Sequence, residues 1–146
     1  MGKISYFNYD LGKLIQCFDK RMRKVQDDML SKYQLTHFHA WYLANLHRYG
    51  EMNMTDLTNK IGVDKANTTR AVKDLMSKGY IEKVGNSERK YNIKLTDKGS
   101  IIAQTFKDHI DKKMKNSFKY FTEEEKKIFF ELLNKLFMGV NDVGNF

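Results

Sequence analysis

The most restrictive feature of the sequence is a pair of short helical segments separated by a glycine turn. Asn53-Met54-Thr55-Asp56 has the pattern of a helix N-terminus, a capping residue followed three positions later by an acidic residue, and Gly62 ends that segment. A second segment, residues 65–78, follows the turn and stops at Gly79. Because two short helices joined by a short glycine turn form a helix-turn-helix, the sequence predicts that motif.

A β-hairpin is expected directly after this pair. Residues 80–84 and 91–95 are β-prone, and the segment 85–90 between them is polar and turn-forming. The order helix, turn, helix, hairpin is that of a winged helix, in which the second helix of the pair enters the major groove of DNA and the hairpin reaches alongside it.

Longer helices are expected on both sides of the winged helix. Apolar residues recur every three or four positions from Ile4 to Met29, and this near-heptad spacing indicates packing against another helix, with some of the stripe meeting a partner chain. A further helix opens at Thr36 and ends near Gly50. After the hairpin, Thr96 caps a helix with an apolar stripe, and the capping box Thr122-Glu123-Glu124-Glu125 opens the last one. The fold class is therefore mainly α with a small β-hairpin.

Composition narrows the class of partner. The 146 residues allow one compact domain, and a formal net charge of +8 favours a polyanion, either nucleic acid or an anionic membrane surface. Residues 60–94 hold nine Lys or Arg against four Asp or Glu, so the positive charge is concentrated in the predicted winged helix. The order of elements favours double-stranded DNA as the partner rather than an ordinary solvated surface.

Cysteine usage and hydropathy predict a cytoplasmic protein that is not inserted in a membrane. The single Cys17 excludes an intramolecular disulfide, the N-terminus lacks the apolar stretch of a signal peptide, and no apolar run approaches the ~20 residues of a membrane span. Because Cys17 lies beside the expected core position Phe18, we interpret it as a small buried thiol rather than a redox switch.

An ordered set of residues resembles the MarR family of bacterial transcriptional regulators. The set comprises Leu35-Thr36, Leu57, Gly62-Val63-Asp64-Lys65, Thr69-Arg70, Leu75, Lys78-Gly79-Tyr80-Ile81-Glu82-Lys83, Arg89 and Leu95-Thr96-Asp97-Lys98-Gly99. The resemblance implies a single MarR-like domain over residues 1–146, with 35–99 as the DNA-binding lobe and 1–34 and 100–146 as a helical dimerisation region. It also implies an obligate homodimer whose two winged helices cover the halves of a pseudo-palindromic operator.

The resemblance also implies a set of DNA-contacting residues. On the second helix of the pair these are Lys65, Asn67, Thr68, Arg70 and Lys73, and in the wing they are Arg89 and Lys90. Asn67 can pair bidentately with adenine and Arg70 with guanine, and the residues alone do not decide which of them reads a base. Arg89 matches the wing-tip arginine that enters the minor groove in the family. The family's aspartate two positions earlier is replaced by Ser87, and Glu88 could take its place only if the tip turns.

Two small-ligand hypotheses follow from the aromatic and histidine residues. Tyr33, His37 and Trp41 could line a cleft where relatives bind small phenolic or anionic effectors, although Trp41 could instead be a core residue. The spacing of the four histidines does not suggest a metal site, and no cofactor is expected.

No catalytic motif is found, so the chain is not expected to be an enzyme. We expect a homodimeric, sequence-specific repressor that is relieved by a small effector. The alternatives are a winged helix used for protein or RNA contact, and an effector-binding dimer without operator specificity.

Overall fold

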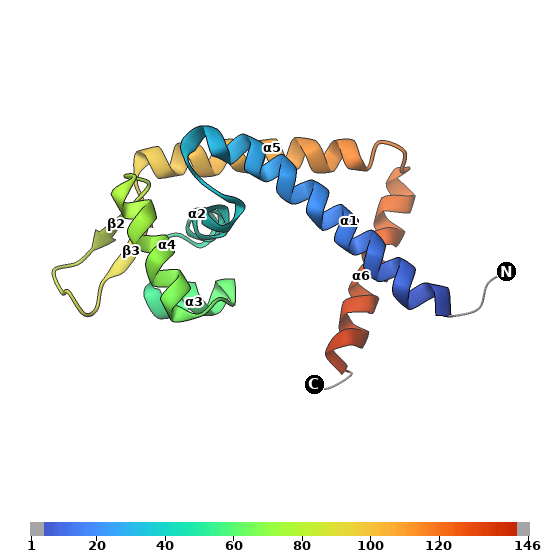
Figure 1. Cartoon of the computed structure of the whole chain (residues 1–146), viewed down its shortest axis with the longest axis horizontal. Coiled ribbons are helices and arrows are strands. Elements are labelled where there is room, and N and C mark those ends of the chain that lie inside the picture. The colour runs from blue at the N-terminus through green and yellow to red at the C-terminus, as the bar shows by residue number, and fades with distance from the viewer. Residues whose placement is uncertain (1–4, 143–146) are drawn as a thin grey trace. The chain divides into compact units, whose positions relative to one another are not determined.

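The winged helix predicted from the sequence is present in the structure, a computed structural model that describes the backbone of residues 5–142 and the side chains of residues 10–140. Its elements follow in the order α2 (His37–Tyr49), β1 (Met52–Asn53), α3 (Met54–Ile61), α4 (Lys65–Ser77), β2 (Ile81–Val84) and β3 (Asn92–Leu95). Figure 1 shows these elements gathered together, with the β2–β3 hairpin reaching outward beside α4. The expected fold class is confirmed.

Local hydrogen bonds fix the helix-turn-helix. The Asn53 side chain accepts a bond from the Asp56 N–H at 2.8 Å, as the capping pattern predicts. Gly62 ends α3 with a φ of +72°, a conformation that glycine adopts without the steric cost of a Cβ. Asp64 then caps α4 by accepting a bond from the Asn67 N–H at 2.8 Å. These caps confine the turn to residues 62–64.

The sheet has three strands rather than the two expected. It is antiparallel with the order β1-β3-β2, and β1 pairs Met52 with Ile93 and Asn53 with Asn92. The two-strand prediction was wrong because β1 is only two residues long, too short to show the alternation that identifies a strand. The extra strand ties the first turn of α3 to the central strand of the wing.

The core of the lobe is formed by α2, α3, α4 and the central strand. Its most deeply buried large side chains include Tyr42, Leu43, Leu57, Leu75 and Ile93, each at most 1% exposed. These apolar residues come from four different elements, so burying them fixes the elements relative to one another.

The outer helices are α1 (Ser5–Leu30), the short 3₁₀ helix η1 (Ser31–Tyr33), α5 (Asp97–Ser117) and α6 (Glu123–Asp142). The boundary between two compact units falls within α5, between His109 and Ile110. The predicted box at the start of α6 is confirmed, because the Thr122 N–H donates to Glu125 Oε2 at 2.8 Å and the Glu125 N–H donates to Thr122 Oγ1 at 3.1 Å. No helix in the described residues is long and apolar enough to cross a bilayer.

The C-terminal end of α1 is buried, whereas its middle is exposed. Of its described side chains only Met29 and Leu30 are buried, whereas Leu14, Ile15 and Phe18 are 68%, 53% and 51% exposed. The interpretation of Cys17 as a buried thiol was wrong for this chain by itself, because Cys17 is exposed with its neighbours. Ile4, the first position of the predicted apolar stripe, and the side chain of Phe7 lie outside the described residues.

Gly99 allows α5 to approach the start of β2 very closely. A Cβ built on Gly99 would lie 1.8 Å from the carbonyl oxygen of Tyr80, a backbone atom that cannot rotate away. The same carbonyl accepts a bond from the Thr96 N–H at 3.1 Å, so the junction between wing and α5 depends on this contact. The glycine is therefore required by packing rather than by an unusual φ.

Replacing Gly99 with alanine is expected to destabilise the protein by about 1–3 kcal/mol or more, because the added methyl group forces the backbone apart. Gly12→Ala is the matched control, because a Cβ added at this helical glycine meets nothing within 4 Å. Alanine should stabilise the helix there by about 0.5–1 kcal/mol. Urea denaturation of both variants at one protein concentration measures the two effects. Equal stability of Gly99→Ala and the wild type would contradict the close contact.

Candidate nucleic-acid interface

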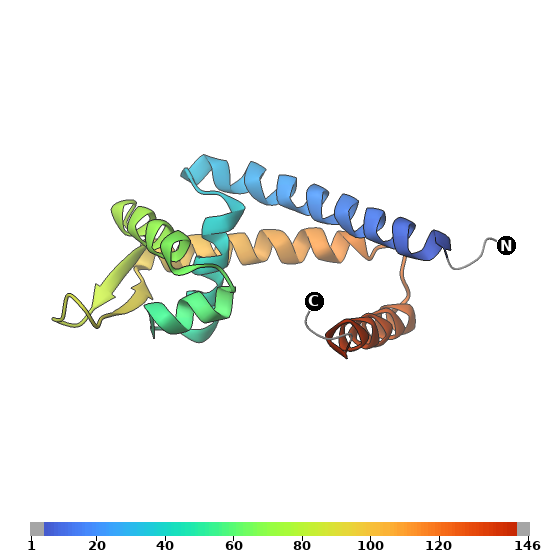
Figure 2. The same cartoon turned by 60° about the horizontal axis from the view of Figure 1, so that its bottom comes forward.

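One face of α4 is buried and the opposite face is open to solvent. Four residues of one helical stripe are at most 4% exposed: Thr68, Ala71, Val72 and Leu75. The opposite side of the helix carries two exposed cations, Arg70 and Lys73, and Lys65 is exposed in the first turn. Because residues three or four apart share a helix face, burial of the first set determines that Arg70 and Lys73 point away from the core. Figure 2 shows α4 beside the hairpin in a second view of the lobe.

The prediction that Thr68 contacts DNA was wrong. Thr68 is 0% exposed, and its Oγ1 accepts a hydrogen bond from the Tyr42 hydroxyl at 3.4 Å. Burial with a hydrogen-bonding partner satisfies the threonine hydroxyl inside the core. Its spacing from Val72 and Leu75, at i+4 and i+7, is the sequence signal that would have placed it on the inner face.

A polar ladder runs along the first turns of α4. Asp64 accepts hydrogen bonds from both the backbone N–H and the side-chain Nδ2 of Asn67. Nη2 of Arg70 donates in turn to Oδ1 of Asn67. The Asn67 N–H, as the largest contribution, holds the pKa of Asp64 below its usual range, so this carboxylate remains ionised. The structure thus joins Asn67 and Arg70, which the sequence treated as separate candidates.

Ser87 organises the tip of the wing through the backbone. Its Oγ accepts bonds from the N–H groups of Arg89 at 3.4 Å and Lys90 at 3.2 Å, and both of these basic residues are exposed. Among the described residues no carboxylate pairs with the Arg89 guanidinium, and Glu88 does not take the place of the family's aspartate. The serine therefore shapes the turn instead of holding the arginine side chain.

The wing and the start of α3 share a groove. It has a volume of 480 Å³ and is lined by Asn53, Met54, Thr55, Asp56, Arg89, Lys90, Tyr91 and Asn92. The wing is further held by a cross-strand ion pair between Lys94 and Glu82, with 3.1 Å between nitrogen and oxygen. The two predicted wing cations are thus placed next to the helix-turn-helix by the paired strands.

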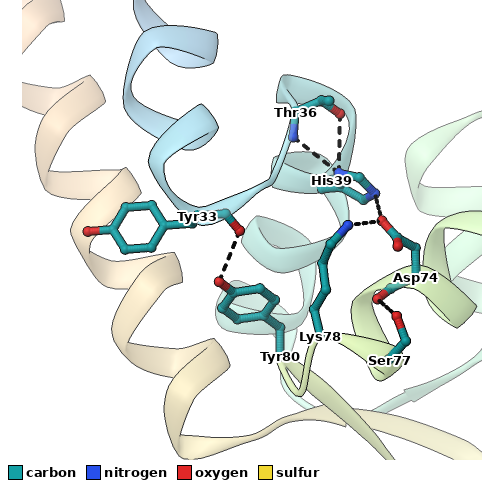
Figure 3. A network of polar contacts seen from close by, with 7 residues as sticks. All are labelled: Tyr33, Thr36, His39, Asp74, Ser77, Lys78 and Tyr80. Carbon is teal, nitrogen blue, oxygen red and sulfur yellow. Dashed lines mark hydrogen bonds and ion pairs between the residues drawn. The ribbon is translucent and has the colours of Figure 1, made fainter.

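A network of polar contacts fastens the far end of α4 to the start of α2 (Figure 3). His39 Nε2 lies 2.9 Å from Asp74 Oδ2, and the Lys78 ammonium group donates to the same oxygen at 2.5 Å. On its other side, Nδ1 of His39 accepts a bond from the Thr36 N–H at 3.1 Å. His39 therefore takes the position that Glu or Gln occupies in a capping box, a role that the sequence reasoning missed.

The charge state of this network follows from its burial. Burial lowers the pKa of His39, the carboxylate of Asp74 opposes this effect, and the ammonium group of Lys78 adds to it. A neutral imidazole with its proton on Nε2 donates to Asp74 while Nδ1 accepts from Thr36. The hydrogen bond from Lys78 is the main influence that lowers the pKa of Asp74. The network at neutral pH is therefore a neutral histidine beside an ionised Asp–Lys pair.

The three residues predicted for an effector site lie around the start of α2. The backbone N–H of His37 donates to Asp27 Oδ1 at 3.0 Å, and its Nδ1 lies at the same distance from that oxygen. The His37 and Trp41 rings lie 6.1 Å apart, centroid to centroid, and Trp41 and Tyr33 are 41% and 40% exposed. In this chain by itself Trp41 is therefore not a buried core residue.

The fold and the exposed basic surface define a winged-helix protein built for nucleic-acid contact. Comparisons with known proteins identify the family of this winged-helix protein. The sequence model of the MarR family matches residues 35–90. The HTH-type transcriptional regulator BilQ of Clostridioides difficile is 30% identical over 119 residues, which cover 80% of each chain. The chain belongs to the MarR family, and it is a DNA-binding transcriptional regulator rather than an enzyme.

Solved structures agree with this assignment at the level of the fold. A MarR protein from Peptoclostridium difficile superposes with a TM-score of 0.81 at 24% identity, covering 97% of this chain and 94% of that one. A variant of E. coli MarR complexed with operator DNA has a TM-score of 0.73 at 22% identity, covering 92% of this chain and 99% of that one.

The free energy of unfolding is expected to fall as the pH drops below about 6.5, the usual pKa of histidine. Because the pKa of His39 is lower in the folded chain, the unfolded chain binds a proton at a higher pH than the folded chain does. Protonation therefore favours the unfolded state, and the free energy of unfolding falls as the pH drops from the unfolded pKa towards the folded pKa. His39→Gln keeps a capping side chain without a titrating group, so it should show a shallower loss. Urea denaturation of both proteins from pH 7.5 to 5 measures the difference, and parallel pH profiles would contradict this role of His39.

Proposed function

We propose that the protein is a sequence-specific repressor that binds a pseudo-palindromic operator as a homodimer. The observation that carries this proposal is the exposed basic face of α4, which lies beside a wing with two exposed cations. The similarity to a MarR structure complexed with operator DNA supports the same function. A surface used for protein docking would be more apolar than this face of α4, so the protein-interaction alternative has less support.

Each candidate DNA-contacting residue of α4 and the wing can be assigned to a groove or to the phosphate backbone. We assign Lys65, Asn67, Arg70 and Lys73 of α4 to the major-groove side. Lys65 and Lys73 present point charges that suit phosphate oxygens, whereas the planar fork of Arg70 suits a base edge. We place Arg89 in the minor groove, where narrow A·T-rich stretches concentrate negative potential, and Lys90 on the adjacent phosphates.

Dimerisation is proposed to bury the apolar surface that the outer helices leave exposed. In α1 this surface includes Leu14, Ile15 and Phe18. In α6 the large apolar side chains at least 38% exposed are Ile128, Phe129, Phe130, Leu132, Leu136, Phe137, Met138 and Val140. Burying apolar surface stabilises an interface by roughly 25 cal/mol per Å², and single chains seldom leave so many large apolar side chains of one helix in water. We therefore assign residues 1–34 and 100–146 to the dimer.

Phe137→Glu is expected to shift the protein from dimer to monomer at micromolar concentration, because a carboxylate would be buried at a position that is 59% exposed in the single chain. Asn134→Glu is the control, since it adds the same charge at an exposed polar position of α6. Sedimentation velocity measures the oligomeric state. A dimeric Phe137→Glu protein, or a wild type that is monomeric, would contradict the assigned interface.

We propose that a small phenolic or anionic effector relieves repression by binding near Tyr33, His37 and Trp41. The exposed Tyr33 and Trp41 rings and the imidazole of His37 offer stacking surfaces and a polar group. An effector can act only through different affinities for two dimer shapes, one of which spaces the recognition helices wrongly for successive major grooves. The nearby Asp27 and Tyr80 contacts tie this region to both α1 and the wing.

Arg89→Ala is expected to weaken operator binding about tenfold or more, equal to ~1.4 kcal/mol, and to leave the dimer intact. Arg21→Ala removes the same charge from an exposed position of α1 and serves as the control. Fluorescence anisotropy with a duplex obtained by binding-site selection measures the affinity at several salt concentrations. Equal affinities of Arg89→Ala and Arg21→Ala would remove the wing from the proposed interface.

A further inference from the structure

The ladder at the start of α4 joins three side chains spaced three residues apart. Asp64 is the N-cap, Asn67 lies one turn later, and Arg70 follows after another turn. The Asn67 amide donates through Nδ2 to Asp64 and accepts through Oδ1 from Arg70. Residues three apart on a helix are neighbours, so the spacing permits this chain of contacts. The ladder lies at the end of α4 whose residues contact base edges in helix-turn-helix proteins.

The ladder commits both ends of the Asn67 amide. Bidentate pairing with adenine uses one amide N–H and the amide oxygen together. In this chain that pairing would compete with the bond to Asp64 and with the bond from Arg70, and Asn67 is half-buried whereas Arg70 is exposed. Asn67 is therefore poorly placed to read a base itself.

The same ladder prepares Arg70 for base contact. A guanidinium group has five N–H donors, and the bond from Nη2 to Asn67 uses one of them. The remaining donors still include the pair needed for O6 and N7 of guanine. Holding the long arginine side chain in one orientation before binding lowers the conformational entropy that binding would otherwise cost.

We infer that Arg70 reads a guanine in each half-site and that Asn67 is a positioning residue for Arg70, with Asp64 fixing the orientation of the Asn67 amide. The inference rests on the proposed operator binding and specifies the base that α4 recognises. Asn67 and Arg70 together then make one base contact, to a guanine. The sequence alone also allowed two separate contacts, one from Asn67 to an adenine and one from Arg70 to a guanine.

Asp64→Asn is the most specific variant for testing this arrangement. Asparagine is about as good an N-cap residue as aspartate, so α4 should still begin at the same residue. In the variant, however, the amide nitrogen of the new asparagine would take the place of the Asp64 oxygen that accepts the bond from Nδ2 of Asn67. Two donors would then face each other. Rotation of the Asn67 amide relieves this conflict but turns Nδ2 toward Arg70, which breaks the contact that positions the guanidinium group. Base preference should therefore change without loss of the helix.

The experiment compares binding-site selection by the full-length wild type with selection by four variants. Arg70→Ala, Asn67→Ala and Asp64→Asn test the ladder, and Lys73→Ala is the control for a phosphate contact. Competition binding with duplexes altered at one base pair then measures each preference, and a duplex with 7-deazaguanine at the inferred position removes the N7 acceptor. Circular dichroism checks that each variant is folded.

The wild-type site is expected to contain a guanine in each half whose preference falls roughly 5- to 150-fold in Arg70→Ala. The preference for the same guanine should also fall in Asn67→Ala and in Asp64→Asn. Replacing this guanine with 7-deazaguanine should weaken binding by the wild type but not binding by Arg70→Ala. Lys73→Ala should lower affinity for all duplexes alike. Loss of an adenine preference in Asn67→Ala, or an unchanged guanine preference in it, would overturn the inference while leaving operator binding intact. A wild type without any preferred site would contradict the proposed function and the inference with it.

Discussion

The packing of one face of α4 into the lobe is the constraint on which the rest of the interface depends. Ala71, Val72 and Leu75 are buried against the neighbouring elements, and Thr68 reaches the Tyr42 hydroxyl inside the same core. A helix whose inner face is fixed in this way has no freedom to rotate, so the side chains of its outer face keep their directions. The contact between Asp74 and His39 of α2 holds the far end of the helix as well.

The wing is connected to this rigid helix by short links. Tyr80 begins the wing, and its hydroxyl donates to the carbonyl oxygen of Tyr33 at 3.2 Å while its own carbonyl is in close contact with α5 at Gly99. The two-residue strand β1 ties the wing to α3 from the other side. Tyr80 therefore joins the wing to both η1 and α5.

Much of the fold could be predicted from the sequence because its signals are local. Asn53 and Thr122 are capping residues, Gly62 ends a helix with a positive φ, and apolar residues recur at helical spacing. Strand β1 could not be predicted, because two residues carry no periodic signal and their pairing with β3 is a long-range contact. The burial of Thr68 and the exposure of Cys17 depend on which neighbour covers each helix face, which the chain alone does not state.

The candidate site was predictable in its location more than in its chemistry. The charge pattern and motif order placed cations on α4 and the wing, and the structure confirms that these elements lie side by side. Residue types could not show that Asn67 is engaged by Asp64 and Arg70, or that Ser87 bonds the wing backbone instead of orienting Arg89. These are contacts between exposed polar side chains, and several partners satisfy each group equally well until the backbone geometry is known.

We propose that α4 occupies the major groove while the wing occupies the minor groove. Dimethyl sulfate footprinting tests both at once, because this reagent methylates N7 of guanine in the major groove and N3 of adenine in the minor groove. We predict protection of guanine N7 in two major-groove segments about 10 bp apart and protection of adenine N3 in the minor grooves that flank them. A bound complex that leaves guanine N7 fully reactive would contradict this arrangement.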